Sequence, residues 1–205
     1  MNGTQAGVIP PVKETNNDIE PPQGVNGIQA GVITPVKKIM INEPLKGVTG
    51  KNETMGNSLV KNNIHAVFHT KKNGITVADA DLTRLFAYIG GIINNTDGVT
   101  LMVGGRPDHV HVLFSLPPTV ALADYMRNLK AKSSHWLKGV SERYAKFAWQ
   151  EGYGAFSVSP TLIEKTVNYI INQEEHHRKR TFREEVELFF KAYGIEYDER
   201  TSLLQ

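Results

Sequence analysis

The chain has 205 residues, of which 40% are hydrophobic and 21% charged, with a formal net charge of +2 and no cysteine. The lack of cysteine excludes disulfides, thiolate metal sites and cysteine nucleophiles, and the lack of an apolar run of about 18 residues excludes a membrane span. The sequence shows no secretory signal and no glycine-rich nucleotide motif. We therefore expect a cytoplasmic protein that uses no nucleotide cofactor.

Residues 1–57 contain a near-exact repeat, because residues 2–13 return as residues 26–37 with ten identical positions. The segment is rich in Pro, Gly and Asn and has no aromatic residue, a composition that favours a flexible leader. Two copies are too few for a solenoid. We therefore expect a leader over 1–57 and one folded domain over 58–205. Tandem duplication of the DNA would also explain the repeat, and Met55 would then be the native start.

Beyond the leader, hydrophobic periodicity predicts alternating strands and helices. Strands are expected at 64–69, 99–103, 109–114 and 153–159, and helices at about 82–93, 120–140, 161–177 and 182–193. Asp79 or Asp81 could cap the first helix, residues 104–107 form a hairpin turn, and Pro160 suits a helix start. This order predicts an α+β, ferredoxin-like or RRM-like split β-α-β fold, with a central antiparallel sheet and helices packed on it.

Two histidines, His109 and His111, lie one residue apart in the predicted third strand. Since side chains alternate along a strand, both point to one face, and the apolar residues between and after them point to the other. Two imidazoles on one face are a natural pair of metal ligands, for zinc or another transition metal. A structural or exposed role is the alternative. His65 and His69 share a face of the first strand and are possible further ligands.

The helix expected at 161–177 separates its apolar and polar residues. Its predicted apolar stripe consists of Ile163, Val167, Ile170 and Ile171. Tyr169 and Gln173 lie one turn apart on a different face, together with His176. A tyrosine outside the stripe is a candidate for chemistry, and packing at a domain or subunit contact is the alternative. The charged run 174–180, including both of its histidines, is typical of a solvated helix end.

A third group of residues mixes cations, a hydroxyl and an aromatic ring on the helix at 120–140. These are Lys130, Lys132, Ser133 and Trp136. They could contact a nucleic-acid backbone or stack on a base, and a plain amphipathic helix end is the alternative. Residues 58–182 carry 15 Lys and Arg against 10 Asp and Glu, a net charge of +5. This surplus is compatible with a phosphate-bearing partner.

Taken in order, these motifs resemble those of the single-tyrosine HUH transposases of the insertion sequence 200/605 group. HUH denotes His-hydrophobic-His, and His109-Val110-His111 matches it. Further matches are residues 104–108, 65–68, 132–136, 147–159 and 169–177. The resemblance covers about residues 61–197, and residues 1–57 match nothing in the family.

The resemblance implies that residues 58–205 form a catalytic domain that cleaves and rejoins single-stranded DNA at the ends of a mobile element. Tyr169 would be the nucleophile and form a 5′-phosphotyrosine, while His109, His111 and Gln173 would hold Mg²⁺ or Mn²⁺. The DNA ends would carry hairpins, and a homodimer would complete each active site across its subunits. Two other hypotheses are a domesticated relative acting on host repeat hairpins and a non-catalytic nucleic-acid-binding module.

Overall fold

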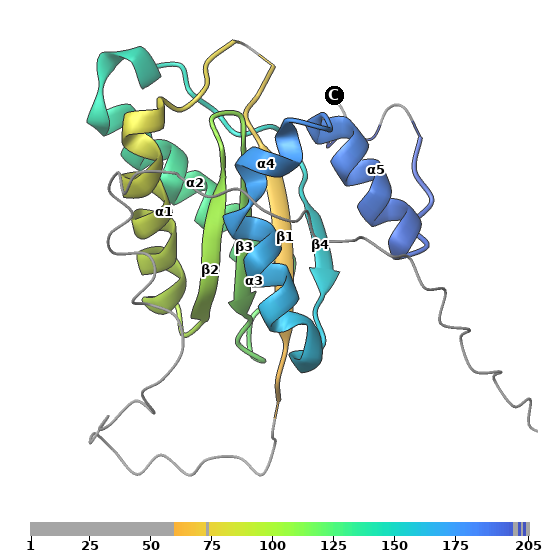
Figure 1. Cartoon of the computed structure of the whole chain (residues 1–205). Helices are drawn as coiled ribbons and strands as arrows, with labels where there is room; N and C mark the ends of the chain where they lie inside the picture. Colours follow the sequence, from red (N-terminus) through yellow and green to blue (C-terminus); the bar gives the residue numbers. More distant parts are fainter. Residues whose placement is uncertain (1–59, 73, 199–200, 202, 204–205) are drawn as a thin grey trace, which may run out of the picture. The chain divides into compact units, whose positions relative to one another are not determined.

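The computed structural model describes residues 60–72, 74–198, 201 and 203, which form a four-stranded sheet with helices on both faces (Figure 1). The predicted leader at 1–57, with its repeat and the start at Met55, lies outside the described residues. The strands are β1 (Asn63–His69), β2 (Val99–Arg106), β3 (His109–Ser115) and β4 (Gly154–Ser157). The helices are α1 (Asp79–Asn94), α2 (Leu122–Val140), α3 (Ile163–Ile171), α4 (Gln173–His177) and α5 (Phe182–Ala192), with short 3-10 turns η2 (Glu142–Tyr144) and η3 (Pro160–Leu162).

Neighbouring strands of the sheet are antiparallel and follow the order β2-β3-β1-β4. Strand β3 lies between β1 and β2, so it splits the β1-α1-β2 unit, and β4 pairs with the other edge of β1. This topology confirms the predicted α+β, ferredoxin-like fold. The predicted hairpin of β2 and β3 is confirmed as well, although pairing continues to Arg106↔His109, so the turn is tighter than expected.

The two central strands are buried on both faces, because helices cover both sides of the sheet. Residues 63–68 of β1 and 109–114 of β3 are buried without interruption. One face of β3 contributes apolar side chains to a core, and the opposite face carries His109 and His111. The sheet therefore holds two imidazoles in the interior of the protein, where each must be matched by a partner.

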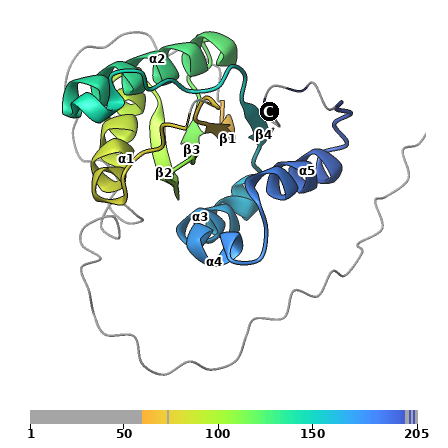
Figure 2. The ribbon, with the colours of Figure 1, turned by 90° about the horizontal axis from the view of Figure 1, so that it is seen from above.

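The helices form a layer on each face of the sheet (Figure 2). Helices α1 and α2 cover one face, over a core that includes Phe68, Leu85, Ile89, Val112, Phe114, Met126, Leu129 and Leu137. Helices α3, α4 and α5 cover the other face, where Met102, Leu113, Val167 and Ile170 form one cluster and Val67, Phe156, Val186 and Phe190 another. Within the described part of the chain, no helix is long and apolar enough to cross a membrane.

The close approach of α3 to the sheet depends on a glycine in β2. A Cβ atom built on Gly104 would lie 2.7 Å from Ile170 Cγ2 and 3.1 Å from the Ile170 carbonyl oxygen. These separations are shorter than van der Waals contact, so a larger residue would push α3 away. Because Tyr169 precedes Ile170, the glycine also sets how near the candidate nucleophile lies to the sheet.

The predicted capping of α1 by an aspartate is wrong. The N-cap residue is Ala78, which has no side-chain cap, while Asp79 and Asp81 lie in the first turn. Asp81 instead accepts a hydrogen bond of 2.8 Å from the Tyr144 hydroxyl, which ties α1 to η2. Acidic residues in the first turn still interact favourably with the helix dipole.

The predicted continuous helix at 161–177 is broken. It consists of η3, α3 and α4, with Asn172 between the last two. Val167 and Ile170 are buried as predicted, but Ile171 is 49% exposed and is not part of the apolar stripe. The break separates α3, which carries Tyr169, from α4, which carries Gln173, and both segments pack on the sheet.

Candidate active site

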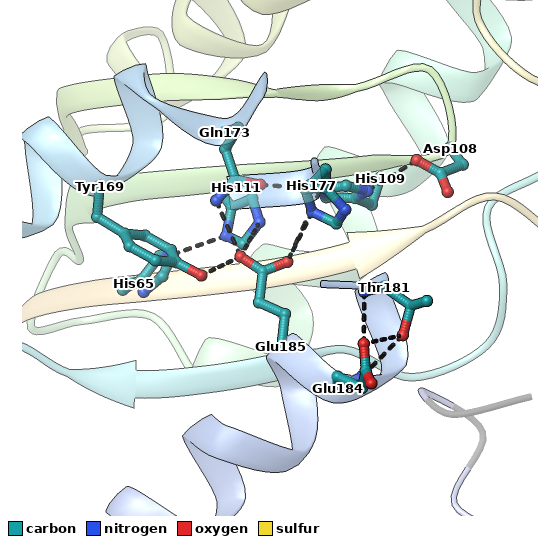
Figure 3. A network of polar contacts seen from close by, with 10 residues as sticks. All are labelled: His65, Asp108, His109, His111, Tyr169, Gln173, His177, Thr181, Glu184 and Glu185. Atoms are coloured by element: carbon teal, nitrogen blue, oxygen red, sulfur yellow. Dashed lines mark hydrogen bonds and ion pairs between the residues drawn. The ribbon is translucent and has the colours of Figure 1, made fainter. Parts of the chain in front are cut away.

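The candidate site lies on the face of the sheet covered by α3, α4 and α5, and four elements contribute to it (Figure 3). Strand β3 supplies His109 and His111, α3 supplies Tyr169, α4 supplies Gln173, and α5 supplies Glu185. Both histidines, Gln173 and Glu185 are buried, and Tyr169 is half-buried. The structure thus brings together the predicted nucleophile and all three predicted metal ligands, and adds a carboxylate.

His109 offers a nitrogen lone pair toward Gln173. Its Nδ1 lies 2.8 Å from the Asp108 carboxylate; because a carboxylate only accepts, Nδ1 carries the hydrogen. This hydrogen bond from His109 also holds the pKa of Asp108 below its ordinary value. In the neutral imidazole, Nε2 is then an acceptor, and it lies 3.1 Å from Gln173 Oε1.

The Gln173 amide is oriented by Glu185, because Gln173 Nε2 donates a hydrogen bond of 2.9 Å to Glu185 Oε1. Its carbonyl oxygen therefore faces His109 Nε2, so two acceptors face each other at 3.1 Å. Two acceptors at this distance repel one another unless a cation or proton lies between them. Two ligands of one divalent ion stand at such a separation, since each ligand atom is about 2.1 Å from the metal.

His111 supplies a second free nitrogen. Its Nδ1 lies 3.0 Å from His65 Nε2. Its Nε2 is buried without a hydrogen-bond partner, 3.4 Å from Glu185 Oε1. One ligand atom each from His109, His111 and Glu185 lie within 4.8 Å of one another. The orphaned nitrogen and the mixed nitrogen and oxygen donors fit a divalent metal ion.

Glu185 was missed by the sequence analysis, although the sequence holds a signal for it. It follows Phe182 by three residues and precedes Phe189 by four, so it lies on the apolar face of α5. Burial opposes its ionisation, but contacts with His111, Tyr169 and Gln173 hold the pKa of its carboxyl well below the usual range. A buried carboxylate that stays charged needs such partners.

The Tyr169 hydroxyl donates a hydrogen bond to Glu185 Oε1. The Tyr169 ring lies 5.9 Å from the His111 ring of the same chain, measured between centroids. Burial raises the pKa of this tyrosine far above its ordinary value, and the charge of Glu185 raises it further. Tyr169 is therefore protonated at neutral pH.

The prediction of a solvated helix end at 174–180 is wrong for His177. Its Nε2 lies 3.1 Å from Glu185 Oε2, and its ring lies 4.5 Å from the His109 ring. Arg178 and Lys179 are exposed and pair with Glu175, as expected for a solvated segment. The histidine belongs to the site because it points toward the sheet.

His65 Nε2 lies 3.0 Å from His111 Nδ1, and burial keeps His65 neutral. Burial, followed by the neighbouring His111, lowers the pKa of His65 to about 3. The unfolded chain protonates this group near pH 6.5. Below pH 6.5 the unfolded chain therefore binds a proton at His65 that the folded chain does not bind. The free energy of unfolding is unaffected by His65 above pH 6.5 and falls by about 1.4 kcal/mol per pH unit as the pH drops toward 3.

We expect His65→Asn to remove this part of the pH dependence. Between pH 7.5 and 5.0, the free energy of unfolding should fall by about 2 kcal/mol less in the variant than in the wild type. Urea unfolding in the presence of a chelator measures the difference. His135→Asn, at an exposed position, is the matched control and should behave as the wild type. An equal loss in His65→Asn and the wild type would contradict the expectation.

The predicted DNA-binding residues lie on α2, on the opposite face of the sheet from the site. Lys130 Nζ donates hydrogen bonds to the carbonyls of Gln150 and Gly152 and lines a hollow of about 450 Å³. Lys132 is exposed. The Trp136 ring is half-buried and stacks on Tyr88 at 4.8 Å. Contacts of Lys130, Lys132 and Trp136 with DNA stay predictions.

Ser133 requires a correction, because it offers no surface to DNA. It is fully buried; its hydroxyl donates a hydrogen bond to the Leu129 carbonyl and accepts one from Trp149 Nε1. A hydroxyl with both functions satisfied inside the core stabilises packing. The residue therefore fixes the loop before β4 against α2.

The chain matches the family model described as "Transposase IS200 like" over residues 58–173, more than half of its length. It therefore belongs to the IS200-like transposase family. The match ends at Gln173, so α5 and Glu185 lie outside it. No curated protein matches the sequence.

Two solved structures are remotely similar to the chain. One is a "putative transposase" from Deinococcus radiodurans R1, with 20% identity and a TM-score of 0.47, covering 59% of this chain and 97% of that one. The other is a REP-associated tyrosine transposase bound to a REP hairpin, with 13% identity and a TM-score of 0.45, covering 61% of this chain and 74% of that one.

Proposed function

We propose that this transposase cleaves and rejoins single-stranded DNA, with Tyr169 as the nucleophile and a divalent metal ion at His109 and His111. The observation that carries the proposal is the convergence of the Tyr169 hydroxyl, through Glu185, with the Nε2 atoms of His109 and His111, one facing Gln173 Oε1 and the other buried without a hydrogen-bond partner. A hydroxyl beside two imidazoles that could bind a divalent metal suits attack on a phosphodiester.

His109, His111, Gln173 and Glu185 would hold the metal. Two nitrogen and two oxygen donors are compatible with Mg²⁺ or Mn²⁺ and leave coordination positions for phosphate oxygens and water. When bound, the ion would polarise the scissile phosphate and orient it, which contributes several kcal/mol to such reactions. Asp108 and His65 hold the two imidazoles so that each presents Nε2.

The reaction exchanges one phosphodiester for another. The Tyr169 oxygen forms a bond to phosphorus, the bond from phosphorus to the 3′ oxygen breaks, and the tyrosine proton ends on that 3′ oxygen. At an ordinary pKa near 10, only roughly one tyrosine in a thousand is ionised at neutral pH. The raised pKa of Tyr169 makes that fraction smaller. Loss of the proton must therefore accompany attack, and rejoining by the reverse step needs no ATP.

The substrate we propose is single-stranded DNA with hairpins at the element ends. Unpaired bases offer stacking faces, and a hairpin offers a shape to recognise. A domesticated relative acting on host repeat hairpins would keep the same site. A non-catalytic module with an RRM-like sheet would need an open sheet face with exposed aromatics, whereas helices cover both faces here (Figure 2).

The direct test is denaturing electrophoresis after incubation with single-stranded element ends and Mg²⁺ or Mn²⁺. We expect a covalent protein–DNA adduct that requires both the metal and Tyr169. An adduct that forms in a chelator, or none with any element end, would contradict the proposal.

The Tyr169 ring lies 5.9 Å from the His111 ring of the same chain, which supports the proposal that one chain completes the site. A homodimer with sites completed across subunits is the arrangement implied by the family resemblance. Mixing His109→Ala with Tyr169→Phe distinguishes the two arrangements. We expect the mixture to form no more adduct than each variant alone, as measured by electrophoresis. Restored adduct would establish shared sites.

A further inference from the structure

Glu185 has more polar partners in the site than a metal ligand alone requires. One oxygen, Oε1, accepts hydrogen bonds from the Tyr169 hydroxyl and from Gln173 Nε2 and lies 3.4 Å from His111 Nε2. The other, Oε2, lies 3.1 Å from His177 Nε2. The Glu185 carboxylate thus connects the candidate nucleophile, Tyr169, to two candidate metal ligands, the His111 imidazole and the Gln173 amide (Figure 3).

Helix α5 is built to hold this carboxylate in place. Thr181 and Glu184 form a capping box that fixes the first turn of α5, in which Glu185 lies. Val186 and Phe190 anchor the helix on Val67 and Phe156 of the sheet. The Glu185 side chain is 5% exposed, so it has little freedom to move. The packing of α5 on the sheet therefore determines the position of the Glu185 carboxylate.

We propose that Glu185 is the positioning residue for the Tyr169 nucleophile. By accepting the hydrogen bond of the tyrosine hydroxyl, it holds that oxygen next to His111 before DNA binds. The inference rests on the proposed function and adds to it a role for the C-terminal part of the chain. The family match ends at Gln173, and α5 supplies the restraint from beyond that point.

Positioning and metal binding by Glu185 have different consequences. A lost ligand is compensated when the metal is saturating, whereas a misplaced nucleophile stays slow at any metal concentration. Misplacing a reacting group by about 1 Å can cost up to roughly a hundredfold in rate. The rate at saturating metal and saturating DNA therefore reports positioning.

The test compares Glu185→Asp, which keeps the charge but retracts the carboxylate by one methylene, with Glu185→Gln, which keeps the length and an acceptor oxygen. Glu187→Asp, on the outer side of α5 and paired with Arg183, is the matched control. The first readout is the single-turnover rate of adduct formation at saturating DNA and Mn²⁺. We expect Glu185→Asp to fall roughly tenfold to a hundredfold, Glu185→Gln to fall less, and the control to match the wild type.

The second readout needs neither DNA nor activity. Nitration of Tyr169 by tetranitromethane in the metal-free protein, followed by peptide mass spectrometry, measures how well its ring is held. We expect several-fold faster nitration of Tyr169 in Glu185→Asp, with Tyr197, which is 44% exposed, as the internal reference. If the wild type forms no adduct, the proposed reaction fails, and the nitration comparison still tests positioning.

Three results would overturn the inference. The first is a Glu185→Asp variant equal to the wild type in rate and in nitration. The second is full recovery of its rate when Mn²⁺ is raised to saturation, which would make Glu185 a ligand only. The third is a Glu185→Gln variant slower than Glu185→Asp, which would mean that charge matters and position does not.

Discussion

Tyr169→Phe is expected to abolish the covalent protein–DNA adduct while leaving binding of single-stranded DNA unchanged. The substitution removes one oxygen, the atom proposed to attack phosphorus, and keeps the ring that packs near His111 and His176. Denaturing electrophoresis measures the adduct, and a gel-shift assay with the same hairpin-bearing DNA measures binding. The loss of a nucleophile cannot be offset by more metal or more DNA.

Tyr197→Phe is the matched control for this prediction. Tyr197 is 44% exposed and packs against Phe190, so this variant should form the adduct at the wild-type rate. A Tyr169→Phe protein that still forms an adduct would reject the assignment of the nucleophile. Loss of DNA binding together with the adduct would show that the hydroxyl serves binding.

His109→Ala is expected to remove most metal binding and to slow adduct formation by roughly a hundredfold or more. The imidazole is fully buried, and its Nε2 faces Gln173 Oε1 at 3.1 Å. Losing about 3 kcal/mol of metal-assisted stabilisation of the transition state corresponds to such a factor. Calorimetric titration with Mn²⁺ measures the affinity, and single-turnover assays measure the rate.

His135→Ala controls for the removal of a histidine as such, because His135 is exposed on α2. It should bind Mn²⁺ as the wild type does. Thermal unfolding of His109→Ala in a chelator checks that the variant is folded, since an alanine at a buried site leaves a cavity. Unchanged Mn²⁺ affinity in a folded His109→Ala protein would place the metal elsewhere.

The sequence predicted the parts of this molecule that obey a local period. The alternation in β3 placed His109 and His111 on one face, and the helical period separated Tyr169 and Gln173 from the apolar stripe. Such patterns depend only on neighbouring residues, so they can be recognised without knowing how the helices and strands pack together. The antiparallel sheet followed from the order of the elements alone.

The sequence could not predict what depends on how distant elements meet. Glu185 enters the site only because α5 packs on β1 and β4, some 75 residues after the histidines in the chain. The sequence around Ser133 predicts a polar surface residue. Its burial depends on a contact with Trp149, 16 residues later, which the local pattern does not reveal. The break at Asn172 has no local sequence signal that we can identify, whereas His177 follows Gln173 by four residues and so lies on the same face of α4.

The proposed reaction would depend on Gly104, although this residue takes no part in the chemistry. Helix α3 packs directly on the backbone of β2, and the lack of a side chain at Gly104 determines how closely α3 approaches the sheet. A single added methyl group there would push Tyr169 away from the candidate metal ligands His109 and His111 without contacting any of these three side chains. The position of the proposed nucleophile thus depends on the close packing of Ile170 against Gly104.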